Sequence, residues 1–312
     1  MERIPYRLFL APMAGITDHA FRAICMGYGA ECCVTELISA KAVVYGDVKT
    51  ASLAALYPDE RPAAIQIFGS EPEIMARAAY ELLKYSPAFI DINMGCPMPK
   101  LVQNGEGCAL MRSPELCERI IKAVKNAVDV PVTAKIRREC DEGADNAPEI
   151  AEACESGGAD MIFVHGRSRA QLYSGRADRG CIKRVKEAVN IPVIANGDIK
   201  SGADREEVLR FTGADGVMVG RGAYGSPWVF AEIKAYAAGE TFEPPTDRQK
   251  RDLLLRQLDT VIADKGDRGV IEFRHHLLQY CKGFPGSAAL RAGIASVKDR
   301  GSARAAIERV FG

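Results

Sequence analysis

The feature of this sequence that most constrains its fold is a regular alternation of short apolar runs with stretches of helical patterning. The runs are rich in β-branched residues and nearly all apolar, which is typical of strands in a parallel sheet buried on both faces. We expect eight strands, at Leu8–Ala11, Cys33–Glu36, Ala63–Phe68, Phe89–Asn93, Val132–Ile136, Met161–His165, Val193–Asn196 and Gly216–Gly220. Helical patterns follow them, for example at Glu71–Lys84, Pro114–Ala127, Pro148–Ser156 and Glu206–Phe211. The alternation predicts successive βαβ units.

Two local repeats favour a closed barrel over an open sheet. A Gly-Ala-acid triplet precedes a strand three times, at residues 29–31, 158–160 and 213–215. A hydrophobe-Pro-hydrophobe triplet opens two other strands, at 130–132 and 191–193, where proline costs no ladder hydrogen bond. Because (β/α)₈ barrels take about 250 residues, we predict an α/β fold with a TIM barrel over residues 1–238.

A short second domain is expected after the barrel. Residues 239–245 form a proline-bearing connection, and Thr246 or Asp247 can cap a following helix. The pattern is then helical to the end, with one break at Gly283-Phe284-Pro285-Gly286. We therefore predict a small C-terminal helical domain at residues 245–312.

Composition excludes several classes of protein. No segment approaches the roughly 18–20 apolar residues of a membrane helix, and the first seven residues lack the apolar run of a signal peptide. The ten cysteines show no framework spacing and no Cys-x-x-Cys pair, and there are only four histidines. We expect a cytoplasmic protein without a membrane segment or a metal site, and a monomer when free.

Charge is unevenly distributed although the net charge is zero. From Pro245 onward there are 13 Lys/Arg and 8 Asp/Glu, a net of about +5, so residues 1–244 carry about −5. This asymmetry indicates a polyanion partner for the C-terminal segment. Ordinary helices with basic faces explain it equally well.

Polar residues gather where the predicted strands end. In (β/α)₈ barrels this end carries the function, because the βα loops begin there. The strand ends carry Pro12, Met13, Ala14, Glu36, Gln66, Asn93, Lys135, His165, Asn196, Gly197, Asp198, Gly220 and Arg221. We expect the active site among them.

The last two strand ends have the character of a phosphate site. Asn196, Gly197 and Asp198 end the seventh strand, and Gly220 and Arg221 end the eighth. Loops after these two strands commonly hold phosphate with backbone N–H groups and a positive side chain. The alternative is that these glycines only form turns.

Three further strand ends carry groups suited to a cofactor ring. Lys135 and His165 are donors that match an electron-rich ring gaining negative charge, such as the N1–C2=O edge of a reduced flavin. Gln66 could bond a ring edge. His165 could equally be a core histidine, and Gln66 could cap its strand.

Cys96 is the candidate catalytic group. It follows a predicted strand and stands between Gly95 and Pro97, at the start of a loop above the barrel mouth. No histidine follows closely to activate it as a nucleophile, and a thiol with a pKa near 8.5 is mostly protonated at neutral pH. A role as proton donor is therefore favoured. The glycine-bearing segment 98–107 is expected to be a mobile lid.

At this point the chain resembles a known family. The segment Asn93-Met94-Gly95-Cys96-Pro97 with Lys100 is similar to the signature of tRNA-dihydrouridine synthases, and further matching motifs occur in the same order. They are Ala11-Pro12-Met13-Ala14-Gly15, Thr17-Asp18, Phe21-Arg22, Thr35-Glu36, Ala134-Lys135, His165-Gly166-Arg167, Asn196-Gly197-Asp198-Ile199, Gly220-Arg221-Gly222-Ala223, Arg274-His275-His276, Tyr280, Lys282-Gly283 and Pro285-Gly286. The resemblance covers nearly the whole chain and is closest to the bacterial B-type branch.

The resemblance implies a cofactor, a reaction and a substrate. It implies FMN bound by Pro12, Met13, Ala14, Gln66, Lys135, His165, Asn196, Gly197, Asp198, Gly220 and Arg221, with NADPH as electron donor. It implies hydride transfer to C6 of a uracil in tRNA and protonation of C5 by Cys96. It further implies tRNA contacts at Asn93, Lys100, Arg167, Arg274 and Lys282.

Two departures and two alternatives accompany the resemblance. Arg179 stands where the family often has an aromatic residue, and the net charge is low for a tRNA-binding protein. Basic residues could compensate as a patch at the rim, formed by Arg167, Arg169, Arg176, Arg179, Lys183 and Arg184. One alternative is an FMN barrel acting on a free pyrimidine, like the dihydroorotate dehydrogenases, which needs no basic tail. The other is a non-catalytic RNA-binding barrel, which would bind no FMN.

Overall fold

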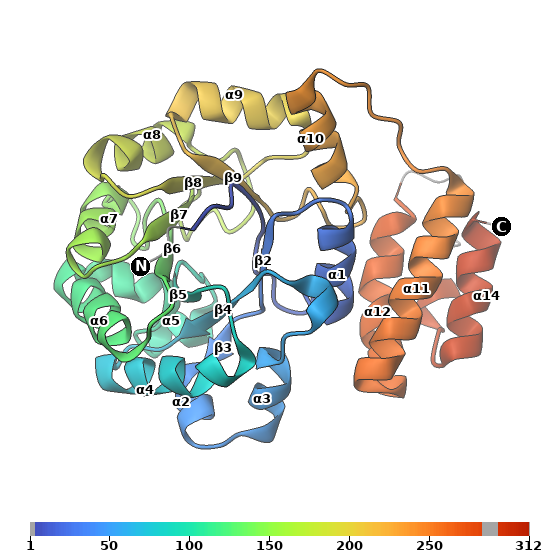
Figure 1. The fold of residues 1–312 in the computed structure, drawn as a ribbon, viewed down its shortest axis with the longest axis horizontal. Helices are drawn as coiled ribbons and strands as arrows, with labels where there is room; N and C mark the ends of the chain where they lie inside the picture. Colours follow the sequence, from blue (N-terminus) through green and yellow to red (C-terminus); the bar gives the residue numbers. More distant parts are fainter. Residues whose placement is uncertain (1–3, 283–292, 312) are drawn as a thin grey trace.

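A computed structural model describes residues 4–282 and 293–311. The chain forms a barrel of parallel strands surrounded by helices, and a group of C-terminal helices stands beside it (Figure 1).

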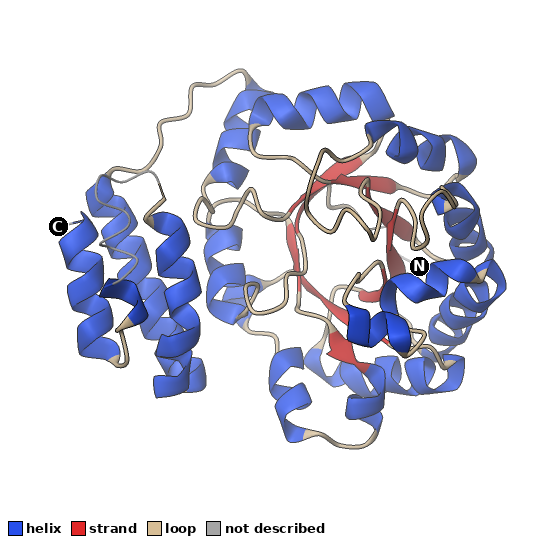
Figure 2. Cartoon of the chain, turned by 180° about the vertical axis from the view of Figure 1, so that it is seen from behind, coloured by secondary structure: helices blue, strands red, loops and turns tan. Residues whose placement is uncertain are grey.

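Eight parallel strands close the barrel. In spatial order they are β1 (Leu8–Leu10), β2 (Cys32–Val34), β4 (Ala63–Phe68), β5 (Ile90–Met94), β6 (Val132–Arg137), β7 (Met161–His165), β8 (Val193–Asn196) and β9 (Gly216–Val219). Pairing of β9 with β1 and of β2 with β4 closes the ring, which is visible end-on in Figure 2. The predicted (β/α)₈ TIM barrel is confirmed.

The outer ring contains one main helix after each of seven strands. These helices are α1 (His19–Gly27), α4 (Pro72–Leu82), α6 (Pro114–Ala127), α7 (Ala147–Ser156), α8 (Arg179–Ala188), α9 (Gly202–Thr212) and α10 (Val229–Ala238). Several begin at a side-chain cap, as where Ser113 accepts from the backbone of Leu116 ahead of Pro114. Their buried faces pack on the outside of the strands and form the largest apolar core.

One insertion was not predicted from the sequence. After β2 the chain forms a two-residue strand, β3 (Ile38–Ser39), and two short helices, α2 (Ala40–Val44) and α3 (Val48–Ala54). Strand β3 pairs with the far end of β4, so the insertion extends the barrel wall at its C-terminal end. Short 3₁₀ segments complete the loops: η1 (Pro58–Glu60), η2 (Leu83–Tyr85) and η3 (Gly107–Arg112), with α5 (Pro99–Gln103) preceding η3.

The C-terminal helices form a small bundle with its own apolar core. They are α11 (Asp247–Lys265), α12 (Asp267–Tyr280) and α14 (Arg300–Phe311), and Thr246 caps α11 in a capping box with Gln249. The bundle packs against α1, whose Ala20 belongs to the same apolar cluster. The predicted break at Gly283–Gly286 lies outside the described residues.

Candidate active site

The lumen of the barrel has an apolar floor and a polar upper layer. The floor contains Phe9, Phe89 and Phe163, whose rings pack edge-on or stacked on one another. Along a strand every second side chain points inward, so inward-facing residues further along the strands lie above the floor. That upper layer contains Gln66, Asn93, Lys135, His165 and Asn196, each from a different strand. The structure thus brings these five predicted residues together at the C-terminal mouth of the barrel.

A buried hydrogen-bond chain joins three of the strands. Gln66 donates through Nε2 to Oδ2 of Asp91 at 2.7 Å and accepts at Oε1 from Nδ2 of Asn93 at 2.8 Å. Thr133 donates from Oγ1 to the other oxygen of Asp91. Burial raises the pKa of the Asp91 carboxyl to about 6. Gln66 therefore has one amide N–H beyond those used in this chain.

Asn93 connects this chain to Cys96. Its Oδ1 accepts from the backbone N–H of Cys96 at 2.9 Å and from that of Gly95 at 3.3 Å. These two bonds fix the start of the loop that carries the thiol. Asn93 thus holds Cys96 directly above the polar layer.

The Cys96 thiol is half-buried in a positively charged surrounding. Burial is the largest influence and raises its pKa, while the charges of Arg137 and Lys135 act in the opposite direction. The thiol is therefore protonated at neutral pH. The nearby cations would stabilise the thiolate left after proton donation.

The segment after Cys96 is folded back on the thiol loop. It contains α5 and η3, and the N–H of Cys108 donates to the carbonyl oxygen of Cys96 at 3.0 Å. A Cβ at Gly107 would lie 2.9 Å from the same oxygen, so only glycine allows this approach. The end of the segment 98–107, which was expected to be a mobile lid, is thus held against the site by the close approach of Gly107 and by the hydrogen bond of Cys108 that follows it.

Arg137 is a site residue that the sequence analysis missed. It is 3% exposed, and its guanidinium donates to the carbonyl oxygens of Gly95, Ser168 and Leu172 at 2.7–3.1 Å. It thereby clamps the Cys96 loop to the β7–α8 loop. Arg137 could have been found from the alternation of side chains along the strand, because it points inward like Lys135 two positions earlier. It was missed because the predicted strand ended at Ile136.

Lys135 lies beside Asn196. Its Nζ donates to Oδ1 of Asn196 at 3.1 Å, and Nδ2 of Asn196 donates to the carbonyl oxygen of Met218 at 2.7 Å. Burial, reinforced by the charge of Arg137, lowers the pKa of Lys135 to about 8. The ammonium is the predominant form at pH 7 but is easily deprotonated.

His165 is neutral because it is buried among cations. Burial and the charges of Lys135, Arg137 and Arg167 lower its pKa far below the ordinary value. A guanidinium nitrogen of Arg167 lies 3.4 Å from Nε2. Since Arg167 can only donate, Nε2 is the acceptor and the ring proton is on Nδ1.

Arg167 holds Asp198 and is not presented to the exterior. It is 2% exposed, and one of its nitrogens contacts both carboxylate oxygens of Asp198, at 2.6 and 2.8 Å. Asp198 also accepts from the N–H of Ala177 at 2.8 Å and has a left-handed φ of 55°. This carboxylate is already satisfied by protein, so it shapes the loop after β8.

Arg221 and Tyr173 form the exposed edge of the mouth. The Arg221 guanidinium lies 5.0 Å from the centre of the Tyr173 ring, and that of Arg137 lies 5.8 Å from it. Arg221 also donates to the carbonyl oxygen of Tyr173 at 3.2 Å. Its side chain is 48% exposed and lies 3.6 Å from a carboxylate oxygen of Asp198, so the cation stands beside the loops after β8 and β9 with one face open to an anion.

The β1–α1 loop, which carries Pro12, Met13 and Ala14, is braced from below. Thr17 accepts at Oγ1 from the N–H of Met13 at 2.9 Å, and Arg22 donates to the carbonyl oxygen of Thr17 at 2.6 Å. Arg22 is itself paired with Glu60, and both side chains are buried. Glu36 accepts from the N–H of Gly15.

The remaining residues predicted to contact RNA are dispersed. Lys100 on α5 and Lys282 after α12 are exposed. Arg274 donates from Nε to the carbonyl oxygen of Val297 at 2.6 Å, inside the helical bundle.

The predicted basic rim patch is largely neutralised by neighbouring carboxylates. Arg179 pairs with Glu207 and Arg184 with Asp145, each at 2.6 Å. Within the described ranges there is no group of three or more His, Cys, Asp or Glu side chains arranged to hold a metal ion. In the same ranges no helix is both long and apolar enough to span a membrane.

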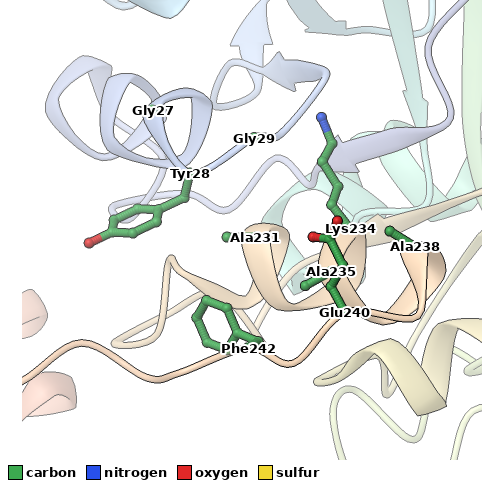
Figure 3. Close-up of a pocket in the computed structure, with 9 residues that line it drawn as sticks. All are labelled: Gly27, Tyr28, Gly29, Ala231, Lys234, Ala235, Ala238, Glu240 and Phe242. Atoms are coloured by element: carbon green, nitrogen blue, oxygen red, sulfur yellow. The ribbon is translucent and has the colours of Figure 1, made fainter.

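A shallow depression on the outside of the barrel is separate from this site. It lies between the C-terminal ends of α1 and α10 and is lined by Tyr28, Lys234, Glu240, Phe242 and neighbouring Gly and Ala residues (Figure 3). These helix ends lie at the N-terminal end of the strands, opposite the mouth. We assign it no part in the chemistry.

Comparisons with known proteins agree with this arrangement. A "probable tRNA-dihydrouridine synthase" of Rickettsia conorii is 39% identical over 295 residues, covering 94% of this chain and 89% of the relative. The "tRNA-dihydrouridine synthase B" of Xanthomonas axonopodis pv. citri is 42% identical over 290 residues, covering 92% and 87%.

Solved structures share the fold at low sequence identity. Histamine dehydrogenase from Rhizobium sp. 4-9 superimposes with a TM-score of 0.58 at 12% identity, over 81% of this chain and 48% of that one. This chain thus spans about half of that structure. A family model described as dihydrouridine synthase (Dus) matches residues 9–311, and the chain therefore belongs to the dihydrouridine synthase family.

Proposed function

We propose that this protein is a flavin-dependent tRNA-dihydrouridine synthase. It reduces the 5,6 double bond of uracil in tRNA, with FMN as the bound cofactor and NADPH as the electron donor. The names of the relatives support the substrate. The observation that carries the chemistry is that Cys96, Lys135 and the loops after β8 and β9 share one end of the barrel.

The side chains at the mouth match FMN by their chemistry. Lys135 and the Nδ1–H of His165 are donors suited to the pyrimidine edge of the isoalloxazine ring, and Arg221 is a cation suited to the phosphate. The proposed cofactor contacts are Pro12, Met13, Ala14, Gln66, Lys135, His165, Asn196, Gly197, Asp198, Gly220 and Arg221. When bound and reduced, FMN supplies the hydride that uracil receives at C6.

Cys96 acts as the general acid. It donates the thiol proton to C5 of the uracil, and the charges of Arg137 and Lys135 stabilise the resulting thiolate. Asn93 fixes the backbone of Cys96 and retains one amide N–H with which to contact the base. Arg167 was predicted to contact RNA, but its guanidinium is buried on Asp198, so we propose that it holds the loop after β8.

The uracil must leave the RNA stack to reach this site. A base inside folded tRNA cannot approach the polar layer of a barrel lumen, so it is extruded into the mouth. Lys100 and Lys282 are exposed and suited to the phosphate backbone. Arg274 is tied to Val297, so its contribution would be to hold the bundle together.

The test begins with the purified protein. We expect a yellow protein that absorbs at about 450 nm and releases FMN on denaturation. With NADPH and unmodified tRNA, mass spectrometry of the digested RNA should detect dihydrouridine, which is heavier than uridine by two hydrogens. Free uracil and orotate serve as comparison substrates.

Each result has a definite reading. A colourless protein that binds no added FMN would refute the proposal. Reduction of a free pyrimidine without reduction of tRNA would instead favour a barrel enzyme of small-molecule metabolism.

A further inference from the structure

Helix α12 of the C-terminal bundle reaches two loops of the barrel mouth. Its His276 is 2% exposed and lies between Phe21 of α1, with ring centres 4.9 Å apart, and Tyr224 of the β9–α10 loop, at 5.3 Å. The ring also interacts with the backbone of Ile16 in the β1–α1 loop. His276 therefore contributes to this contact by the packing of its ring and by its approach to that loop.

The same helix approaches the β9–α10 loop at its backbone. Gly225 has a φ of 85°, and a Cβ there would lie 2.8 Å from the carbonyl carbon of Gln279 on α12. This contact is closer than any other residue would allow. It lies four residues after Arg221, in the loop proposed to hold the phosphate of FMN.

The contacts of the bundle with α1 and the β9–α10 loop form a seam between the two domains. A charged contact extends this seam to the β1–α1 loop. Lys265, at the end of α11, donates to Oδ2 of Asp18 at 2.7 Å, and Asp18 caps α1 by accepting from Phe21. The adjacent Thr17 holds Met13. A continuous series of contacts thus runs from the bundle to the loop proposed to lie against the flavin ring.

We propose that α12 is a positioning element for the cofactor loops, with His276 as its central residue, so that RNA docking on the bundle and FMN binding in the barrel are coupled. This inference rests on the proposed function and adds a regulation of the same site. Coupling is reciprocal, so bound tRNA raises the affinity of the protein for FMN by the same factor by which bound FMN raises its affinity for tRNA.

The chain contains a natural reporter of this seam. Trp228 is its only tryptophan and precedes α10, next to the β9–α10 loop. Its ring lies 6.1 Å from Tyr280 of α12 and 6.5 Å from Tyr28 at the end of α1. Its fluorescence in cofactor-free protein therefore reports the contact between the two domains.

The decisive experiment compares cavities at two places in the bundle. His276→Ala removes the ring from the seam, whereas Ile307→Ala removes a fully buried side chain of α14, which packs on α11 and α12. FMN affinity is measured by titrating full-length cofactor-free protein. We expect His276→Ala to weaken FMN binding about tenfold or more and Ile307→Ala to change it less than about twofold. His276→Phe, which retains a ring, should restore affinity to within about threefold of wild type.

A second measurement uses only the wild-type protein. The FMN dissociation constant is determined with and without saturating unmodified tRNA, and Trp228 emission of the cofactor-free protein is recorded on adding tRNA. We expect at least about a fivefold tightening and a change in emission. Equal effects of the two alanine variants, or an FMN affinity that tRNA leaves unchanged, would overturn the coupling. Such a failure with intact dihydrouridine formation would leave the proposed function standing.

Discussion

At the barrel mouth, cations and their partners are placed so that each side chain sets the protonation state of the next. Lys135 and Arg137 lower the pKa of His165, and both offset the effect of burial on Cys96. The result is a neutral imidazole, a protonated thiol and an ammonium at neutral pH. These are the donors that the proposed reaction requires.

Cys96→Ala is expected to abolish proton donation without removing the cofactor. Turnover of tRNA should fall about 10²–10⁴-fold, as for loss of a general acid, while FMN content and tRNA affinity stay near wild type. Because burial raises the pKa of the thiol, the wild-type single-turnover rate should stay level through neutral pH and fall in alkali. Cys181→Ala on the outer helix α8 is the control. Full activity of Cys96→Ala would eliminate the acid role.

Lys135→Met is expected to separate stability from function. Burial lowers the pKa of Lys135 to about 8. Below that pH the folded protein therefore carries a buried ammonium charge, which lowers the free energy of unfolding. The unfolded chain keeps its proton up to about pH 10.4. The cofactor-free variant should therefore be more stable than wild type by about 1–2 kcal/mol at pH 7.

The pH dependence and the cofactor affinity of Lys135→Met complete this prediction. Its stability gain should shrink as the pH rises from about 8 to about 10. The variant should nevertheless bind FMN more weakly. Thermal unfolding across pH and FMN titration measure both, and an unchanged FMN affinity would remove Lys135 from the cofactor site.

At the scale of elements, alternation along the strands accounts for much of the site. Phe163 precedes His165 by two residues and Ile194 precedes Asn196 by two, so apolar floor and polar mouth lie on the same inner face. Sequence patterning predicted the strands and helices well because these segments have strong periodicity; the predicted helix Pro114–Ala127 coincides with α6.

The residues that sequence patterning missed lack such a local signal. Asp91 is hidden inside an apolar run, and the insertion from Ile38 to Ala54 has short elements without clear periodicity. Contacts such as His276 with Phe21 join residues more than 250 positions apart, which no local pattern records. Candidate residues at the strand ends were accessible from the sequence, but their partners were not.

The loop after β8 provides a test of what Arg167 does. Arg167→Met would remove the guanidinium nitrogen that contacts both carboxylate oxygens of Asp198 and free the loop to shift. FMN affinity should fall by about 10–100-fold, whereas tRNA affinity of protein saturated with FMN should change little. Lys282→Ala, at an exposed position, should show the opposite pattern. A selective loss of tRNA affinity in Arg167→Met would restore it as an RNA contact.

At the scale of the whole molecule, two domains meet at a seam with both apolar and charged contacts. His19 of α1 contacts one carboxylate from each domain: Nε2 lies 2.9 Å from Asp59 of η1, and Nδ1 lies 2.7 Å from Asp264 of α11 in the bundle. Its ring also stacks on Tyr57. With a carboxylate at each ring nitrogen, both nitrogens are donors, so the imidazolium is the form that fits. Although burial acts in the opposite direction, the two carboxylates raise the pKa of His19.

The contacts of His19 with Asp59 and Asp264 predict that the stability of the folded protein depends on pH. A raised pKa in the folded state means that the stabilisation is complete below the ordinary pKa of histidine and is lost as pH rises through the raised value. The midpoint of thermal unfolding of the wild type, relative to that of His19→Gln, should fall by about 1–3 °C between pH 6 and pH 9. Comparison with this variant cancels the opposite effect of Lys135, and a difference between the two proteins that stays constant over the same range would contradict the prediction.

The connection between α10 and α11 is mostly exposed, whereas the contacts of α11 and α12 with α1 and the β9–α10 loop are buried. The buried contacts, and not the exposed connection, therefore hold the two domains in place. A single proteolytic cut within residues 240–245 should yield two fragments that still migrate together as one particle. The bundle is thus attached to the barrel in the way that one subunit of an oligomer is attached to another, through a buried non-covalent interface.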